Sequence, residues 1–201
     1  MTTDAKKYQG PYKGVVVSNV DQMRAGRLLV RVADVLGNDP CIWADPATPL
    51  AGLASGMYVV PMVNSGVWVQ FVDGDIERAV WTGFWRGGAG ELPPAAQAAP
   101  DGTPQVVIGT PAQSCLLISD LSGPTGGILL QLKGPAGPYI RMYEGGIEIG
   151  ASANGPTIKV TPAGIDLGNG GGPPRAGGAG GAVDGGRPAR PSGGGREGQW
   201  Q

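Results

Sequence analysis

Two segments of the sequence, residues 139–150 and 157–168, repeat one another at an offset of about 18 residues and align without a gap. They read YIRMYEGGIEIG and TIKVTPAGIDLG. Each unit holds two short alternations of apolar and charged residues on either side of a Gly-containing turn. Such alternation predicts β-strands with one buried and one solvated face. The repeat therefore predicts a stack of very short antiparallel strands.

Strands this short do not form a stable structure by themselves. An isolated hairpin is marginal in water. Ordering each residue costs about 1–2 kcal/mol of backbone entropy, which two apolar side chains per strand cannot offset. We therefore expect the units to borrow strands from other copies of the chain, as a β-prism or an intertwined β-helix closed around an axis. The alternative is that the two units are hairpins of an ordinary β-sandwich.

In such a rod, the alternation divides the side chains into two sets. The charged set is expected to face solvent and comprises Arg141, Glu148, Lys159 and Asp166. A similar spacing of Leu130 and Leu132 upstream is interpreted as an imperfect additional rung. The residues expected to face the axis are Leu130, Leu132, Ile140, Met142, Ile147, Ile149, Ile158, Val160, Ile165 and Leu167.

The composition favours turns and short strands over helices. The chain carries 38 Gly and 19 Pro with 15% charged residues, and it shows no amphipathic helical pattern. Its formal net charge of -1 provides no basic surplus for binding nucleic acid. Cys41 and Cys115 fit no metal motif and are interpreted as buried free thiols. Residues 1–10 contain no apolar core of a secretory signal, so we expect a protein made in the cytoplasm.

The first part of the chain predicts a small barrel. Five candidate strands, rich in β-branched residues and separated by turns, lie at residues 14–19, 27–32, 42–44, 66–72 and 79–85. The long Pro/Gly/Ala-rich connection at 45–61 fits the irregular excursion of an OB-type barrel over residues 11–86, preceded by an arm at 1–10. Its core volume is expected to come mainly from the aromatic residues Trp43, Trp68, Phe71, Trp81 and Trp85.

The rest of the chain divides by composition into three segments. Residues 87–104 contain Pro93-Pro94 and are predicted to be an extended linker. A stem is expected over residues 105–168, with further strands at 105–109, 114–120 and 127–133 before the repeat. Residues 169–201 are rich in Gly and Pro and are predicted to be a flexible tail or a tip.

The sequence lacks the residue types of the common catalytic sites. It contains no His, which excludes His-based acid–base catalysis, the Ser-His and Cys-His nucleophile systems and His-ligated metals. A small acidic cluster, Asp73, Asp75 and Glu77, is interpreted as a solvated turn rather than a Ca²⁺ loop. We therefore expect no catalytic residue, no metal site and no cofactor, and we predict that the protein is not an enzyme.

Several stretches resemble one known family. They are GVVVSNVDQMRAGRLLVRV at 14–32, PMVNSGVWVQF at 61–71, LISDLSGPTGGILLQL at 117–132, and the GIEIG and GIDLG units. In this order they resemble the spikes of contractile tails, the phage baseplate assembly protein V group and the valine–glycine-repeat spike proteins of type VI secretion. The resemblance implies a homotrimer whose OB barrels form a collar between the hub or tube and an intertwined β-helical stem.

The resemblance also implies a function and partners. We expect a structural central spike that joins the baseplate hub and tube proteins to the tip and pierces a target membrane transiently when the sheath contracts. It would be assembled into a phage virion baseplate or another contractile injection particle. The Gly-rich tail would either bind a separate tip protein or extend the apex itself. Without His, the HxH-type iron site of some phage spikes is not expected. The alternatives are an OB-fold module that binds single-stranded nucleic acid or an oligosaccharide, and a spike that carries a wall hydrolase.

Overall fold

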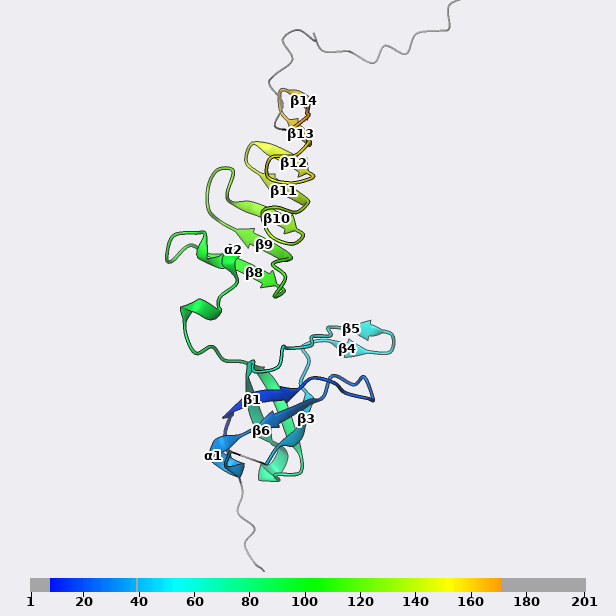
Figure 1. Ribbon diagram of the computed structural model, residues 1–201, viewed down its shortest axis with the longest axis vertical. Coiled ribbons are helices and arrows are strands. Elements are labelled where there is room, and N and C mark those ends of the chain that lie inside the picture. Colours follow the sequence, from blue (N-terminus) through cyan, green and yellow to red (C-terminus); the bar gives the residue numbers. More distant parts are fainter. Residues whose placement is uncertain (1–7, 39, 171–201) are drawn as a thin grey trace, which may run out of the picture. The chain divides into compact units, whose positions relative to one another are not determined.

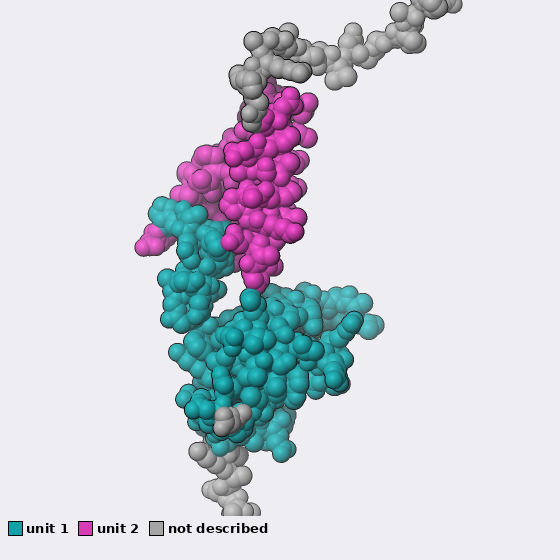
Figure 2. All heavy atoms as spheres, viewed as in Figure 1, with its two compact units in different colours: residues 1–100 teal, residues 101–201 magenta. Residues whose placement is uncertain are grey.

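The computed structural model describes residues 8–38 and 40–170. The chain divides into two compact units, residues 1–100 and residues 101–201 (Figure 2). Strands dominate both units, which confirms the predicted all-β class (Figure 1). The predictions made for the start of the N-terminal arm and for nearly all of the Gly-rich tail lie outside the described residues.

The first unit contains a closed barrel in the strand order β1-β2-β3-β7-β6. Neighbouring strands pair antiparallel, except that β3 and β7 run parallel. This barrel confirms the predicted N-terminal OB-type fold, and its strand bounds lie within two residues of the predicted ones. The strands are β1 (Tyr12–Ser18), β2 (Leu28–Arg31), β3 (Ile42–Pro46), β6 (Gly66–Phe71) and β7 (Ala79–Phe84).

The connections of this unit hold only short elements. The excursion between β3 and β6, predicted to be irregular, forms a hairpin instead, because the two strands β4 (Ala51–Gly52) and β5 (Ser55–Gly56) pair antiparallel. The remaining elements are single turns of helix in the loops and in the segment after β7. They are α1 (Ala33–Leu36), η1 (Val72–Gly74), η2 (Ala89–Glu91) and α2 (Pro94–Gln97).

Small aliphatic residues fill most of the barrel interior. Inward and outward positions alternate along β6, where every second residue from Val67 to Phe71 is buried. A closed barrel of five strands leaves a narrow interior, so Val and Leu side chains suit it better than several indole rings. The buried cluster comprises Val16, Leu28, Val30, Val32, Ala44, Val67, Val69, Phe71, Ala79 and Trp81.

The predicted aromatic core is therefore wrong in part. Phe71 and Trp81 lie inside the barrel, and the Trp81 Nε1–H donates a hydrogen bond to the Gly26 carbonyl at 3.1 Å. Trp43 instead is 44% exposed, because its neighbour Ala44 takes the inward position on β3. Trp68 on β6 also faces outward, because its neighbours Val67 and Val69 take the inward positions.

Trp85, the fifth predicted core aromatic, lies just after β7 and is half-buried. Its Nε1–H donates a hydrogen bond to the Gly14 carbonyl at 3.0 Å, and the Lys13 ammonium lies 4.8 Å from its ring centroid. A side chain added at Gly66 would lie 2.6 Å from this ring, so a glycine is needed there. Trp85 thus packs against Gly14 and Gly66 on neighbouring strands rather than filling the centre of the barrel.

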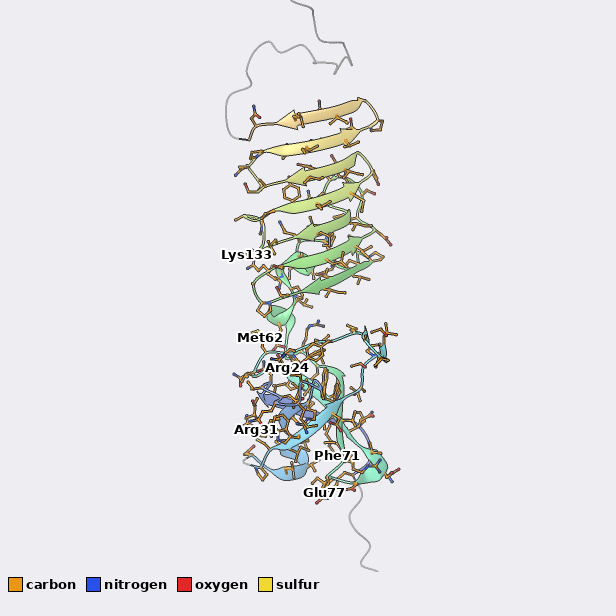
Figure 3. The ribbon with its side chains drawn as sticks, turned by 90° about the vertical axis from the view of Figure 1, so that its right-hand side faces the viewer. Arg24, Arg31, Met62, Phe71, Glu77 and Lys133 are labelled. Carbon is orange, nitrogen blue, oxygen red and sulfur yellow. The ribbon has the colours of Figure 1, made fainter. Side chains whose placement is uncertain are left out.

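The second unit is one seven-stranded sheet in the order β14-β13-β12-β11-β10-β9-β8 (Figure 3). Every strand pairs antiparallel with the strand before it in the chain, so the sheet is a simple meander. Its strands are β8 (Gln105–Gly109), β9 (Cys115–Ser119), β10 (Gly127–Gln131), β11 (Tyr139–Tyr143), β12 (Gly146–Gly150), β13 (Thr157–Thr161) and β14 (Gly164–Gly168).

This sheet differs from the expected rod in how its strands find partners. Each strand has five residues rather than three, and its backbone pairs within the same chain. Two-residue turns join β11 to β12 and β13 to β14 as hairpins, and connections of five to seven residues join the other neighbouring strands. Strands from other copies of the chain are therefore not needed to complete the hydrogen-bond ladder. What the single chain leaves uncovered is one face of the sheet.

Glycines with positive φ begin three alternate strands of the sheet. Gly127, Gly146 and Gly164 begin β10, β12 and β14 with φ values of 76°, 136° and 149°. L-residues with a side chain rarely adopt this backbone region. A Cβ atom at Gly146 would also lie 2.0 Å from the Val160 carbonyl oxygen of the next strand. Gly127 and Gly146 are therefore required for both conformation and space, whereas Gly164 is required for conformation alone.

We predict that a fragment ending at Arg86 folds by itself. The barrel strands pair with one another and enclose their own buried cluster, so the fragment keeps its main source of stability. Circular dichroism should show a β-rich spectrum and a cooperative thermal transition. A fragment that is unfolded at room temperature would show that the barrel depends on the second unit.

Candidate functional site: the apolar face of the C-terminal sheet

One face of the seven-stranded sheet, called the apolar face below, carries two apolar residues from every strand. The register places them in two columns that cross the whole sheet. The first column is Val106, Ile118, Ile128, Met142, Ile147, Val160 and Ile165. The second column is Ile108, Leu116, Leu130, Ile140, Ile149, Ile158 and Leu167.

Most of these side chains are exposed in the single chain. Their exposed fractions run from 41% for Met142 and Ile147 to 76% for Leu167 on the last strand. Leu116 and Ile128 are half-buried. Monomeric soluble proteins rarely expose a contiguous apolar surface of this extent, and such surfaces mark binding interfaces. The apolar face is therefore the main candidate site of the protein.

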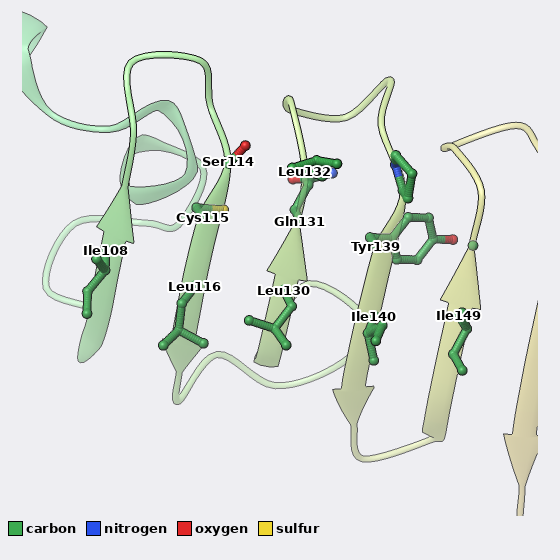
Figure 4. A pocket seen from close by; sticks show the side chains of 12 residues that line it. Ile108, Ser114, Cys115, Leu116, Leu130, Gln131, Leu132, Tyr139, Ile140 and Ile149 are labelled. Carbon is green, nitrogen blue, oxygen red and sulfur yellow. The ribbon is translucent and has the colours of Figure 1, made fainter. Parts of the chain in front are cut away.

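The part of the second column from β8 to β12 lines a shallow groove with a volume of about 640 Å³. Figure 4 shows Ile108, Leu116, Leu130, Ile140 and Ile149 in one row across successive strands. The ends of the strands add residues such as Leu132 and Pro138 to its border. The groove is almost entirely apolar, so it suits another row of apolar side chains better than a polar ligand.

The structure places the predicted axis residues on this face with one exception. Leu132 follows the end of β10 and lies at the border of the groove, while Ile128 and Leu130 supply the two face positions of that strand. The cause is register, because Leu130 pairs with Ile140 and Ile128 pairs with Met142. Five further face residues were not predicted, although the same alternation marks them. They are Val106, Ile108, Leu116, Ile118 and Ile128.

The opposite face carries a ladder of alternating charges over the last four strands. Arg141 faces Glu148, Glu148 faces Lys159, and Lys159 faces Asp166 in direct cross-strand register. The Lys159 ammonium lies 3.6 Å from the Glu148 carboxylate. Opposite charges at directly facing positions stabilise a sheet by roughly 0.2–1 kcal/mol per pair.

Glu148 differs from the expectation that the whole charged set faces open water. Its side chain is 14% exposed, and its Oε1 accepts a hydrogen bond of 2.6 Å from the Tyr139 hydroxyl. The hydrogen bond to Glu148 raises the pKa of Tyr139. The Tyr139 ring covers this position because Gly150 beside it has no side chain to displace the ring.

Toward the first strands, the opposite face becomes apolar. Leu117 on β9 and Leu129 on β10 face each other there and are buried, with exposed fractions of 7% and 8%. This end of the sheet thus has apolar residues on both faces, whereas the charged end has its apolar residues on the other face only.

The acidic cluster at the end of the barrel forms a turn. Asp73 pairs with Arg78 at 2.7 Å, and an Asp75 carboxylate oxygen accepts a hydrogen bond from the Glu77 backbone N–H. Over residues 8–38 and 40–170, no group of three or more His, Cys, Asp or Glu side chains is placed to hold a metal ion. In the same part of the chain, no helix has the length and apolar character to cross a membrane.

A barrel joined to a sheet with one uncovered apolar face indicates a protein that assembles with other chains. Two family models match it: residues 12–85 match the OB domain of type VI secretion and phage-baseplate injectors, and residues 105–172 match the C-terminal trimerisation domain of phage baseplate V proteins. The chain belongs to this family of baseplate spike proteins, and it has a structural role in a baseplate. A search of curated proteins gave no match.

We predict that the charge ladder contributes little to assembly. Changing its four residues to Ser removes pairs worth about 0–1 kcal/mol each. It also removes two hydrogen bonds, from Tyr139 to Glu148 and from Arg141 to the Pro124 carbonyl, worth about 0.5–1.5 kcal/mol each. Thermal unfolding should shift by only a few degrees, and light scattering should give an unchanged mass. The four residues are Arg141, Glu148, Lys159 and Asp166.

The matched comparison changes four neighbours on the apolar face to Ser. This variant should lose assembly, because each buried Ile or Leu contributes about 1.5–3 kcal/mol. If the charge-free variant dissociates while the apolar variant stays assembled, the roles of the two faces are reversed. The four neighbours are Ile140, Ile149, Ile158 and Leu167.

Proposed function

We propose that the protein is a homotrimer in which the apolar faces of three sheets meet around a common axis. The observation that carries this proposal is the pair of unbroken apolar columns from β8 to β14, which the single chain leaves exposed. Burial of these columns against two further copies gives each chain the core that it lacks. The match to a trimerisation domain over the same strands supports three copies rather than another number.

The trimer acts as the central spike of a contractile tail or injection machine. The barrels form a collar toward the hub and tube, and the three sheets form the stem that leads toward the target. Sheath contraction drives the stem into the target envelope, and the narrow cross-section of the stem concentrates the force on a small area. The function is mechanical, and the protein is not an enzyme.

The ladder of the sheet suits this mechanical role. Each strand from β9 to β13 pairs with a strand on both sides through backbone hydrogen bonds, and the strands follow one another without a long loop. The backbone hydrogen bonds between successive strands and the continuous apolar axis therefore share any compression along the stem. A rod of this kind deforms less than a bundle of separate segments joined by flexible connections.

The partners of the spike follow from its place in the machine. We propose hub and tube proteins at the barrels, a separate tip protein at the Gly-rich tail, and a target membrane contacted only transiently. We propose that the protein is made in the cytoplasm and assembled into a phage virion baseplate or a related particle. Nucleic acid is not a partner in this proposal.

We predict that Ile147→Asp dissociates the trimer. Ile147 lies on the apolar face of β12, so three aspartates would meet at the axis, where an unpaired charge costs several kcal/mol or more. Size-exclusion chromatography with light scattering should report the mass of one chain instead of three. Particles that contain this variant should assemble poorly and lose the ability to puncture target cells.

Two controls test whether the position or the charge causes this loss. Ile147→Val keeps an apolar side chain at the axis and should remain trimeric. Thr161→Asp introduces the same charge on β13, next to the face residue Val160 but on the opposite face, and should also remain trimeric. A trimeric Ile147→Asp variant with unchanged melting would contradict the inward placement of the apolar face.

A further inference from the structure

A second exposed apolar surface lies at one end of the barrel, on the excursion that contains β4 and β5. Residues 50–63 project beyond the barrel strands as a hairpin (Figure 1). In this subsection the word arm means this hairpin and not the N-terminal residues 1–10. Leu53 at the tip is fully exposed, and no charged residue occurs between Asp45 and Asp73. The large exposed apolar residues of the arm are Leu50, Leu53, Met57, Tyr58, Val60, Met62 and Val63.

The arm is an ordered element that the barrel holds in place. The Met57 N–H donates a hydrogen bond to the Leu50 carbonyl at 2.9 Å, which closes the hairpin. The Asn19 side chain donates a hydrogen bond to the Pro61 carbonyl at 2.8 Å and ties the base of the arm to the β1–β2 loop. A preformed apolar hairpin loses little conformational entropy on binding, which favours a role in docking.

The outer wall of the barrel offers a surface that matches the arm. Leu29 on β2 pairs with Trp43 on β3 and with Ser18 on β1, so these side chains form one patch with the exposed Val17. The Arg27 guanidinium lies 5.2 Å from the centroid of the Trp43 ring. Exposed Trp and Arg side chains are the types that dominate binding energy at protein interfaces. Val17, Leu29, Trp43 and Arg27 are called the wall patch below.

The charge of the wall patch is neutralised within the chain. The Arg27 guanidinium pairs with the Asp21 carboxylate at 2.8 Å, and the Asp21 side chain is only 3% exposed. The hydrogen bond from Arg27 holds the pKa of Asp21 well below its usual range, so the pair stays ionised at neutral pH. A paired arginine has little charge left for a phosphate, and therefore the patch suits an uncharged apolar segment better than a nucleic acid.

We infer that the arm of each barrel docks on the wall patch of the next copy of the same chain. This inference rests on the proposed trimer, which holds two further barrels close to each arm at a high effective concentration. The arm and the wall patch are different surfaces, so their contact is head-to-tail, and three such contacts close a ring. The barrels thus form a second interface, which adds to the interface of the stem and forms only when the stem holds the three chains together.

Hydrogen–deuterium exchange on the full-length protein tests this inference. Amides of the arm should be protected in the wild-type trimer, and Trp43→Gln should raise their exchange by about tenfold or more while the mass remains that of a trimer. Phe84→Gln removes an aromatic residue of similar exposure from β7, outside the wall patch, and should leave the arm protected. Amides of β6 report whether the barrel is still folded.

A second variant covers the case in which Trp43→Gln perturbs the barrel. Leu53→Gln changes the fully exposed tip of the arm and should also release the arm without changing the exchange of β6. Equal protection of the arm in the wild type and in both variants would overturn the inference, as would protection that persists in the monomeric Ile147→Asp variant.

The remaining outcomes separate this inference from the proposed function. A wild-type protein that is trimeric but has an unprotected arm overturns the inference alone. If such an arm becomes protected only when phosphatidylcholine vesicles are added, its partner is a lipid surface and not a second copy. A wild-type protein that is monomeric by light scattering overturns both proposals.

Discussion

The register of the antiparallel ladder from β8 to β14 is the constraint on which the rest of the second unit depends. Because side chains alternate between the two faces, a shift of one residue in any pair would move the apolar residues of that strand to the charged face. The two-residue turns prevent this shift in the β11–β12 and β13–β14 hairpins by fixing their lengths. The assembly surface is therefore a consequence of turn geometry as much as of apolar composition.

Much of the fold could be predicted from the sequence because its patterns are local. The alternation in residues 139–168 defines strands, faces and turns within a few positions, and the barrel strands are bounded by clear turn residues. The register between strands was harder to predict from the sequence. Leu132 has the right spacing from Leu130, but the chain leaves β10 at Gln131, and no local pattern marks that end.

The interior of the barrel shows a different limit of sequence reasoning. Large aromatic residues are natural candidates for a core, yet Trp43 faces outward because Ala44 takes the inward position on its strand. Which parity a short strand adopts depends on its partners across the barrel, and three to five residues do not determine it alone. The outward aromatic residue then becomes available for contacts beyond the single chain.

The meander topology has a consequence for how the protein is made. Since every strand of the second unit pairs with its neighbour in the chain, most contacts are local, and local contacts favour rapid folding. One chain can complete its ladder before it meets another, whereas covering the apolar face depends on the concentration of other copies. Newly synthesised chains thus pass through a folded state with an exposed apolar surface, and the rate at which three of them meet sets the competition between assembly and aggregation.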